Sequence, residues 1–192
     1  MRRISSTNCW LKTVSRNSFL VMFNPDAQER LCADTEDCLS GDYPTLGEMG
    51  GVWGTNTAKA WLVPQLVDLS EYCGCKEKMS VRMLEQCASV IVTEYPYLKV
   101  TEYMLFFHRM KAGRYGEFYG SVDPQRITTS LRRFVAERNE MLAAIEQRER
   151  EKRQAEEMKA SPPVSWEEYC RRTGREPGPV PTVSFPKVPN VK

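Results

Sequence analysis

The sequence predicts an all-α protein: a compact bundle of about five helices that continues into a long charged helix extension and a proline-rich tail. Three observations predict this class. Apolar residues recur at helical spacing in successive stretches between residues 55 and 145, which is the pattern of amphipathic helices. Residues typical of helix starts and stops bound those stretches. The end of the chain is rich first in alternating charges and then in proline, so it adds no core.

Composition and cysteine usage set the broad class. The chain has 192 residues, of which 41% are hydrophobic and 27% charged, as in an ordinary globular protein. No run approaches the roughly 18 apolar residues that a membrane span needs, and Lys12, Arg16 and Asn17 interrupt any signal-peptide core. Seven cysteines, an odd number with irregular spacing, favour reduced thiols over a disulfide framework. We therefore expect a cytoplasmic protein with no membrane partner.

The domain boundaries follow the same signals. The beginning of the chain has few apolar positions at helical spacing, so we expect it to be partly disordered or loosely packed, with one short helix after Asn24-Pro25. Core helices should begin at Thr55 and Ser80, and Pro64 should kink or locally break the first of them. The predicted parts are an N-terminal segment 1–43, a helical core 44–145, a solvated charged helix 146–160 and a tail 161–192.

A helical hairpin at residues 98–138 organises the core. Thr101 begins a short helix that is apolar around much of its circumference, so we expect it to be the most buried helix. Gly113 ends that helix, and Asp123 with Pro124 opens the last one. The residues expected to face inward are Leu105, Phe106, Phe107 and Met110 in the first helix and Ile127, Leu131, Phe134, Leu142 and Ile145 in the second.

Two segments after the core are candidates for partner contacts. The charged helix 146–160 is interpreted either as a spacer or as a partner-binding helix, and it lacks the heptads of a coiled coil. A Ser-x-x-Glu capping box predicts a short helix near residues 165–172, with Trp166 and Tyr169 on one side. These two aromatic residues form a candidate docking segment. The alternative is that this short helix folds back on its own domain.

The sequence shows no catalytic constellation. It has no phosphate-binding glycine loop, and the single histidine, His108, lies in an apolar helix where a packed side chain is the favoured interpretation. Cys73, Cys75 and Cys87 lack the second cysteine pair that a zinc site needs. We therefore expect a protein that is not an enzyme, with no catalytic residue, no metal and no cofactor.

The most informative stretch is KAGRYGEFYGSVDP at residues 111–124, where glycines alternate with aromatic residues beside basic ones. Aromatic rings stack on bases, and arginines neutralise phosphates. Residues 99–138 carry eight basic and four acidic residues, against five and twelve in residues 24–98. The alternative is that the rings pack under a tight connection whose glycines adopt positive φ. The candidate nucleic-acid or partner surface comprises Lys111, Arg114, Tyr115, Tyr119, Arg126 and Arg133.

Three stretches between Thr45 and Glu149 carry a resemblance to known proteins: WLVPQLVDLSEYCGCKEKMSV, YLKVTEYMLFFHRMKAGRYGEFYGSVDP and LRRFVAERN. They resemble a family of small uncharacterised helical proteins encoded on bacterial mobile elements and phages. The likeness is most specific at residues 98–138, where the motif KxGRYGxFYGxxDP occurs. In outline, a helical core followed by a charged helix is loosely similar to phage replisome organisers and replicative-helicase loader or inhibitor proteins, which bind a helicase and sometimes origin DNA.

This resemblance implies a non-enzymatic accessory protein of mobile-element or phage DNA replication. Its partner would be a replicative helicase or another replication protein, with DNA as a second ligand. The alternative is a protein–protein interaction or structural protein with no nucleic-acid role. A salt-dependent DNA titration separates the two, because phosphate contacts weaken steeply with ionic strength.

Overall fold

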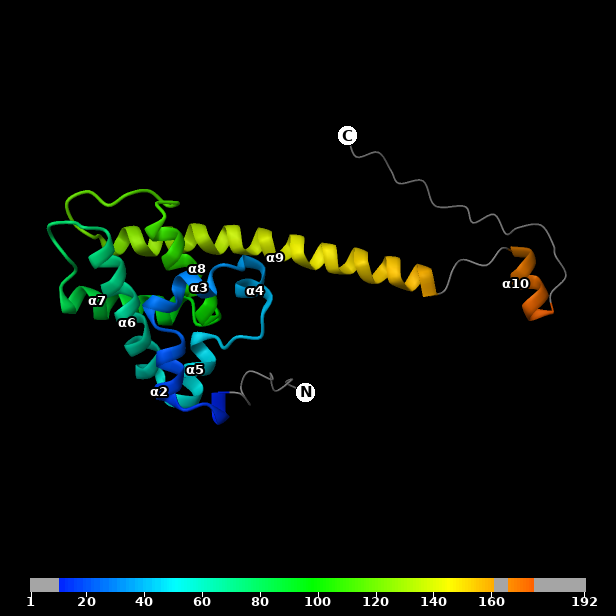
Figure 1. Cartoon of the computed structure of the whole chain (residues 1–192), viewed down its shortest axis with the longest axis horizontal. Coiled ribbons are helices and arrows are strands. Elements are labelled where there is room, and N and C mark those ends of the chain that lie inside the picture. Colours follow the sequence, from blue (N-terminus) through cyan, green and yellow to red (C-terminus); the bar gives the residue numbers. More distant parts are fainter. Residues whose placement is uncertain (1–10, 161–165, 175–192) are drawn as a thin grey trace, which may run out of the picture. The chain divides into compact units, whose positions relative to one another are not determined.

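The computed structural model describes residues 11–160 and 166–174, and within them it confirms the all-α class (Figure 1). No strand occurs in this part of the chain; two isolated bridges, Thr45 with Lys99 and Glu77 with Ser121, are its only strand-like pairings. The chain divides into two compact units, Met1–Ile145 and Glu146–Lys192. The predicted proline-rich stretch from residue 175 lies outside the described residues.

Short helices open the described part of the first unit. They are α2 (Arg16–Met22), the 3₁₀ helix η1 (Pro25–Ala27), α3 (Gln28–Leu31) and α4 (Thr35–Ser40). Side chains of Ser15, Asn24 and Asp34 cap three of them by accepting backbone N–H bonds, which satisfies donors that a short helix leaves unpaired. The helix start predicted at Asn24-Pro25 is therefore confirmed, as one turn of 3₁₀ helix.

These short helices contribute to the same core as the longer ones. Buried side chains from this segment include Leu11, Phe19, Phe23, Cys38 and Leu39. The core is therefore not limited to the about five helices that the sequence predicted. The sparse apolar positions of this segment gave no helical stripe, because each helix here is too short to show one.

Longer helices complete the unit: α5 (Leu46–Trp53), α6 (Thr55–Tyr72), α7 (Val81–Glu94), α8 (Val100–Lys111) and α9 (Pro124–Ala160). Thr45 and Glu48 form a capping box at α5, and Ser80 caps α7 as predicted. The helix α6 continues through Pro64, because buried residues on both sides of the proline hold its two halves in one packed face. It packs against both α5 and α7.

The helix α8 is the centre of the unit, as the sequence predicted. Nine of its twelve residues are buried, including Phe106 and Phe107, and it contacts α3, α4 and α6. Its capping residue Glu102 is also buried and accepts a hydrogen bond from the backbone N–H of Lys99 at 2.8 Å. Arg138 of α9 donates to the other carboxylate oxygen of Glu102 at 2.7 Å. A buried ion pair therefore ties α9 to the beginning of α8.

The second unit contains the end of α9 and α10 (Trp166–Thr173). Every side chain from residue 146 to residue 160 is exposed. Glu146 and Arg150, one helical turn apart, form an ion pair at 3.7 Å, an exposed contact of the kind that adds about 0.3–0.5 kcal/mol to a helix.

Candidate functional site

The six candidate surface residues lie at the end of α8, in the connection 112–123 and on the first turns of α9. This connection carries three glycines with positive φ, Gly113 at 74°, Gly116 at 91° and Gly120 at 76°. Positive φ strains residues that carry a Cβ, so the glycines allow the chain to turn sharply between two helices. The predicted conformational role of these glycines is confirmed.

Glu137 of α9 gathers three groups from α8 and the connection. Its Oε2 atom accepts a hydrogen bond from the Tyr115 hydroxyl at 3.1 Å and lies 3.1 Å from Nε of Arg114. The guanidinium of Arg109 lies 3.6 Å away on the same oxygen. One carboxylate thus neutralises part of the positive charge of this region, and Arg114 is already engaged in an intramolecular contact.

Tyr115 belongs to the core, which corrects its assignment to the candidate surface. Its side chain is only 4% exposed, and its ring lies 5.9 Å from that of Phe106 between centroids. Burial, and then the negative charge of Glu137, raise the pKa of the Tyr115 hydroxyl. A base cannot stack on this ring, because the residue is buried and the Arg133 guanidinium already lies over the ring. The packing interpretation of the aromatic turn therefore holds at this position.

Truncation of Tyr115 should destabilise the protein and not probe a binding surface. We expect Tyr115→Ala to lower the free energy of unfolding by about 3–5 kcal/mol, as for other large aromatic residues removed from a core. Tyr115→Phe keeps the ring and loses the bond to Glu137, so its cost should be smaller, about 1.5–3 kcal/mol. Urea unfolding followed by circular dichroism measures both. An alanine variant as stable as the wild type would place this ring at the surface after all.

Lys111 is likewise part of an intramolecular contact. It forms an ion pair with Asp68 of α6, and its ammonium group lies 5.7 Å from the centre of the Tyr72 ring. Only 16% of its side chain is exposed. The ion pair joins the last residue of α8 to α6, so this charge is largely compensated inside the fold.

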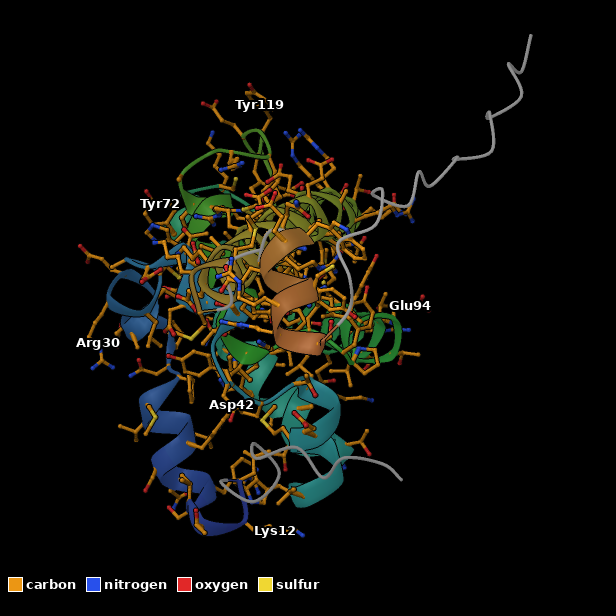
Figure 2. All side chains as sticks on the ribbon, turned by 90° about the vertical axis from the view of Figure 1, so that its right-hand side faces the viewer. Lys12, Arg30, Asp42, Tyr72, Glu94 and Tyr119 are labelled. Carbon is orange, nitrogen blue, oxygen red and sulfur yellow. The ribbon has the colours of Figure 1, made fainter. Side chains whose placement is uncertain are left out.

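The remaining candidates, Tyr119, Arg126 and Arg133, keep accessible groups. Tyr119 is 79% exposed, and Figure 2 shows it at the outer end of the connection, pointing away from the ribbon. The guanidinium of Arg126 lies 5.7 Å from the Phe118 ring, and that of Arg133 lies 5.7 Å from the Tyr115 ring. Each arginine therefore rests on an aromatic face with hydrogen-bond donors left over.

Arg132 joins this group, although it is not among the surface residues predicted from the sequence. Its side chain is exposed, and within residues 11–160 and 166–174 no carboxylate pairs with Arg126, Arg132 or Arg133. Its exposure could have been predicted from the sequence. Arg132 directly precedes Arg133 in the predicted last helix, and it is not one of the positions expected to face inward. We call Tyr119, Arg126, Arg132 and Arg133 the arginine–tyrosine surface.

Gly116 shapes this surface. A Cβ atom at this position would collide with the guanidinium of Arg126, so only glycine lets that group lie against the backbone of the connection. One nitrogen of the guanidinium, Nε, is buried there without a hydrogen-bond partner. Arg126 therefore holds the connection against α9 through its contact with Phe118.

His108 lines a cleft of about 370 Å³ together with Asp26, Asp68 and Lys111, so charged groups are among its neighbours. Within the described residues, no group of three or more His, Cys, Asp and Glu side chains is placed to hold a metal ion. Burial raises the pKa of the Cys87 thiol to about 11, which keeps this cysteine in its unreactive, protonated form at neutral pH.

The candidate docking segment lies in α10 of the second unit. The rings of Trp166 and Tyr169 stack at 5.6 Å between centroids with an interplanar angle of 17°, and Tyr169 is exposed. The predicted cap, Ser165, lies outside the described residues. Both aromatic residues are thus on one side of a short helix, as predicted.

Comparisons with known proteins identify a family but no activity. None of the helices in the described part of the chain has the length and apolar character of a membrane span. No curated protein and no solved structure matches the chain. The model of DUF6633, a family of unknown function, matches residues 78–176. This match covers just over half of the chain and includes α7, α8, the connection, α9 and α10. The protein therefore belongs to this family of unknown function.

Proposed function

We propose that the protein is a non-enzymatic accessory protein of mobile-element or phage DNA replication, which binds a replicative helicase or another replication protein and also contacts DNA. The observation that carries the binding role is the arginine–tyrosine surface. Three arginines there have no carboxylate partner in the described residues, beside a tyrosine that is 79% exposed.

The contrast with neighbouring basic residues gives this observation its weight. Lys111, Arg114 and Arg138 each pair with a carboxylate of the same unit, so the fold compensates several of the basic groups near the hairpin. Uncompensated guanidinium groups attract anions and pair with phosphate in a bidentate geometry. A phosphate-bearing ligand therefore suits this surface, and the replication setting rests on the loose similarity in outline to phage replisome organisers and helicase loaders.

The protein partner is assigned to α10. Tryptophan and tyrosine are the side chains that most often dominate the free energy of protein–protein binding. Trp166 and Tyr169 present such a pair on one helix.

Binding of purified replicative helicase to the tagged full-length protein tests the partner. We expect the helicase to be retained, and the double substitution Trp166→Ala with Tyr169→Ala to weaken binding by about thirtyfold, as expected for paired hot-spot residues. Tyr97→Ala is the matched control, because Tyr97 is also an exposed tyrosine but lies between α7 and α8. If the helicase is not retained by the wild-type protein, the helicase-binding proposal is wrong.

A second candidate function is a protein–protein interaction or structural protein with no nucleic-acid role. The observation that favours it is the neutralisation of Lys111 and Arg114 by Asp68 and Glu137, which leaves a smaller basic footprint than a dedicated DNA-binding domain shows. Titration of DNA at several salt concentrations separates the two functions. Affinity that falls steeply with salt supports the first, and no affinity at low salt supports the second.

A further inference from the structure

Tyr119 is exposed although the connection around it is fixed to the rest of the first unit. On one side of it, Phe118 carries the Arg126 guanidinium on its ring, and its carbonyl oxygen lies 3.9 Å from Sγ of Cys75. On the other side, Val122 is buried. Backbone bonds of 3.3 Å also join Glu77 to Gly120 and Val122 to Glu77. The connection is therefore anchored on both sides of Tyr119, and its ring is held in solvent.

The spacing of the arginines along α9 suits the binding of successive phosphates. Arg126 and Arg133 are seven residues apart on α9, which places them about two helical turns, or about 10 Å, apart on one face of the helix. Arg132 lies about 100° around the helix axis from Arg133, so it adds a charge on the neighbouring face of α9. A flexible polyanion that follows α9 meets successive guanidinium groups, and each contact releases counterions.

We propose that the arginine–tyrosine surface binds single-stranded nucleic acid, with a base stacked on Tyr119 and the backbone phosphates held by Arg126, Arg132 and Arg133. This inference rests on the proposed function and specifies the form of nucleic acid that the surface takes. A free ring at the tip of an anchored connection offers one flat face for a base. A paired duplex offers it no base face, since its bases are stacked on one another.

The charges on the connection limit the affinity. Glu117 and Asp123 are exposed carboxylates on the same segment, and Asp123 also accepts the backbone N–H of Gln125 at 2.8 Å. They leave the surface moderately basic, so stacking must supply a large part of the binding free energy. A single strand uses both features of the surface, because its phosphates meet the arginines and a base stacks on the ring. An acidic protein would meet the same arginines, so its binding is one of the outcomes that the test separates.

Fluorescence anisotropy tests whether the surface prefers single strands. It compares the binding of a labelled oligothymidine of about 15 nucleotides with that of a hairpin duplex that has the same label and number of phosphates. The full-length protein should bind the single strand more tightly than the duplex. Tyr119→Ala should weaken binding to the single strand by about tenfold and Tyr119→Phe should not, because stacking needs only the ring. Circular dichroism of both variants checks that the fold is retained, as expected for so exposed a side chain.

The phosphate contacts are tested by the dependence of affinity on salt. Arg133→Ala should weaken the binding of the oligothymidine and reduce the slope of log affinity against log salt by about 0.7. Arg30→Ala is the matched control, because Arg30 is an exposed arginine on α3 and Figure 2 shows it far from Tyr119. The control should leave both the affinity and the slope close to those of the wild type.

Three results overturn the inference. Equal or tighter binding of the duplex would do so while leaving the proposed replication role in place. Polyglutamate that binds as tightly as the oligothymidine would assign the surface to an acidic partner. No binding of either nucleic acid at low salt would remove the nucleic-acid contact altogether. Helicase binding through Trp166 and Tyr169 is measured separately, so its success or failure is independent of all three results.

Discussion

Replacing Arg138 with methionine should lower the free energy of unfolding by about 3–5 kcal/mol, because it leaves a charged carboxylate buried without its partner. The carboxylate is that of Glu102, whose side chain is 0% exposed, and Arg138 donates to it at 2.7 Å. Methionine keeps much of the volume of the arginine stem, so the effect reports the lost charge and hydrogen bond. Urea unfolding followed by circular dichroism measures the change.

Arg132→Met is the matched control for this substitution. Arg132 lies on the same helix and is exposed, and among the described residues no carboxylate pairs with it. Its replacement should change stability by no more than about 0.5 kcal/mol. The double variant Glu102→Gln with Arg138→Met should recover part of the loss, because the buried charge is gone and the amide still accepts the Lys99 N–H bond. A cost for Arg138→Met as small as that of the control would contradict the prediction.

Trp61→Ala should cost about 3–5 kcal/mol, the range for large aromatic residues truncated in a core. Trp61 of α6 is 2% exposed, and its ring meets that of Tyr103 edge to face at 6.2 Å between centroids. Its Nε1 atom also donates to the carbonyl oxygen of Phe23 at 2.8 Å. This bond satisfies a carbonyl at the end of α2, where the last carbonyl groups of a helix have no N–H donor within the helix.

The matched variant Trp61→Phe separates packing from hydrogen bonding. Gln65 also donates to the carbonyl oxygen of Phe23, at 3.0 Å, so that oxygen keeps one partner, and the phenylalanine variant should lose only about 1 kcal/mol from this bond. In the Trp61→Ala variant, the rate of amide hydrogen exchange should rise most at residues 16–31, which the bond from Trp61 to Phe23 joins to α6. Faster exchange confined to other helices would mean that Trp61 does not anchor the beginning of the chain.

The sequence predicted what local signals determine. Helix starts at Ser80 and Asn24 follow from side-chain capping, which involves only neighbouring residues. The burial of α8 follows from apolar residues on most of its faces. The positive φ of Gly116 follows from the sharp turn between two helices. Each of these predictions needed no knowledge of distant residues.

Contacts between distant residues were out of reach. Tyr115 looked like a surface ring because nothing in its neighbourhood reveals Glu137 or the ring of Phe106 as partners. The pairing of Glu102 with Arg138, 36 residues away, could not be predicted from spacing. The burial of Phe19 could not be predicted either, because its helix of seven residues is too short to show an apolar stripe.

Two adjacent residues of α9 also decide how α8 and α9 align. Arg138 holds the acidic beginning of α8 through Glu102, and Glu137 holds its basic end through Arg109. If α9 slid along by one turn, both charges would leave their partners, and the carboxylate of Glu102 would stay buried alone. Because a single replacement at either position lowers stability, we expect Glu102 and Arg138 to vary together among members of this family.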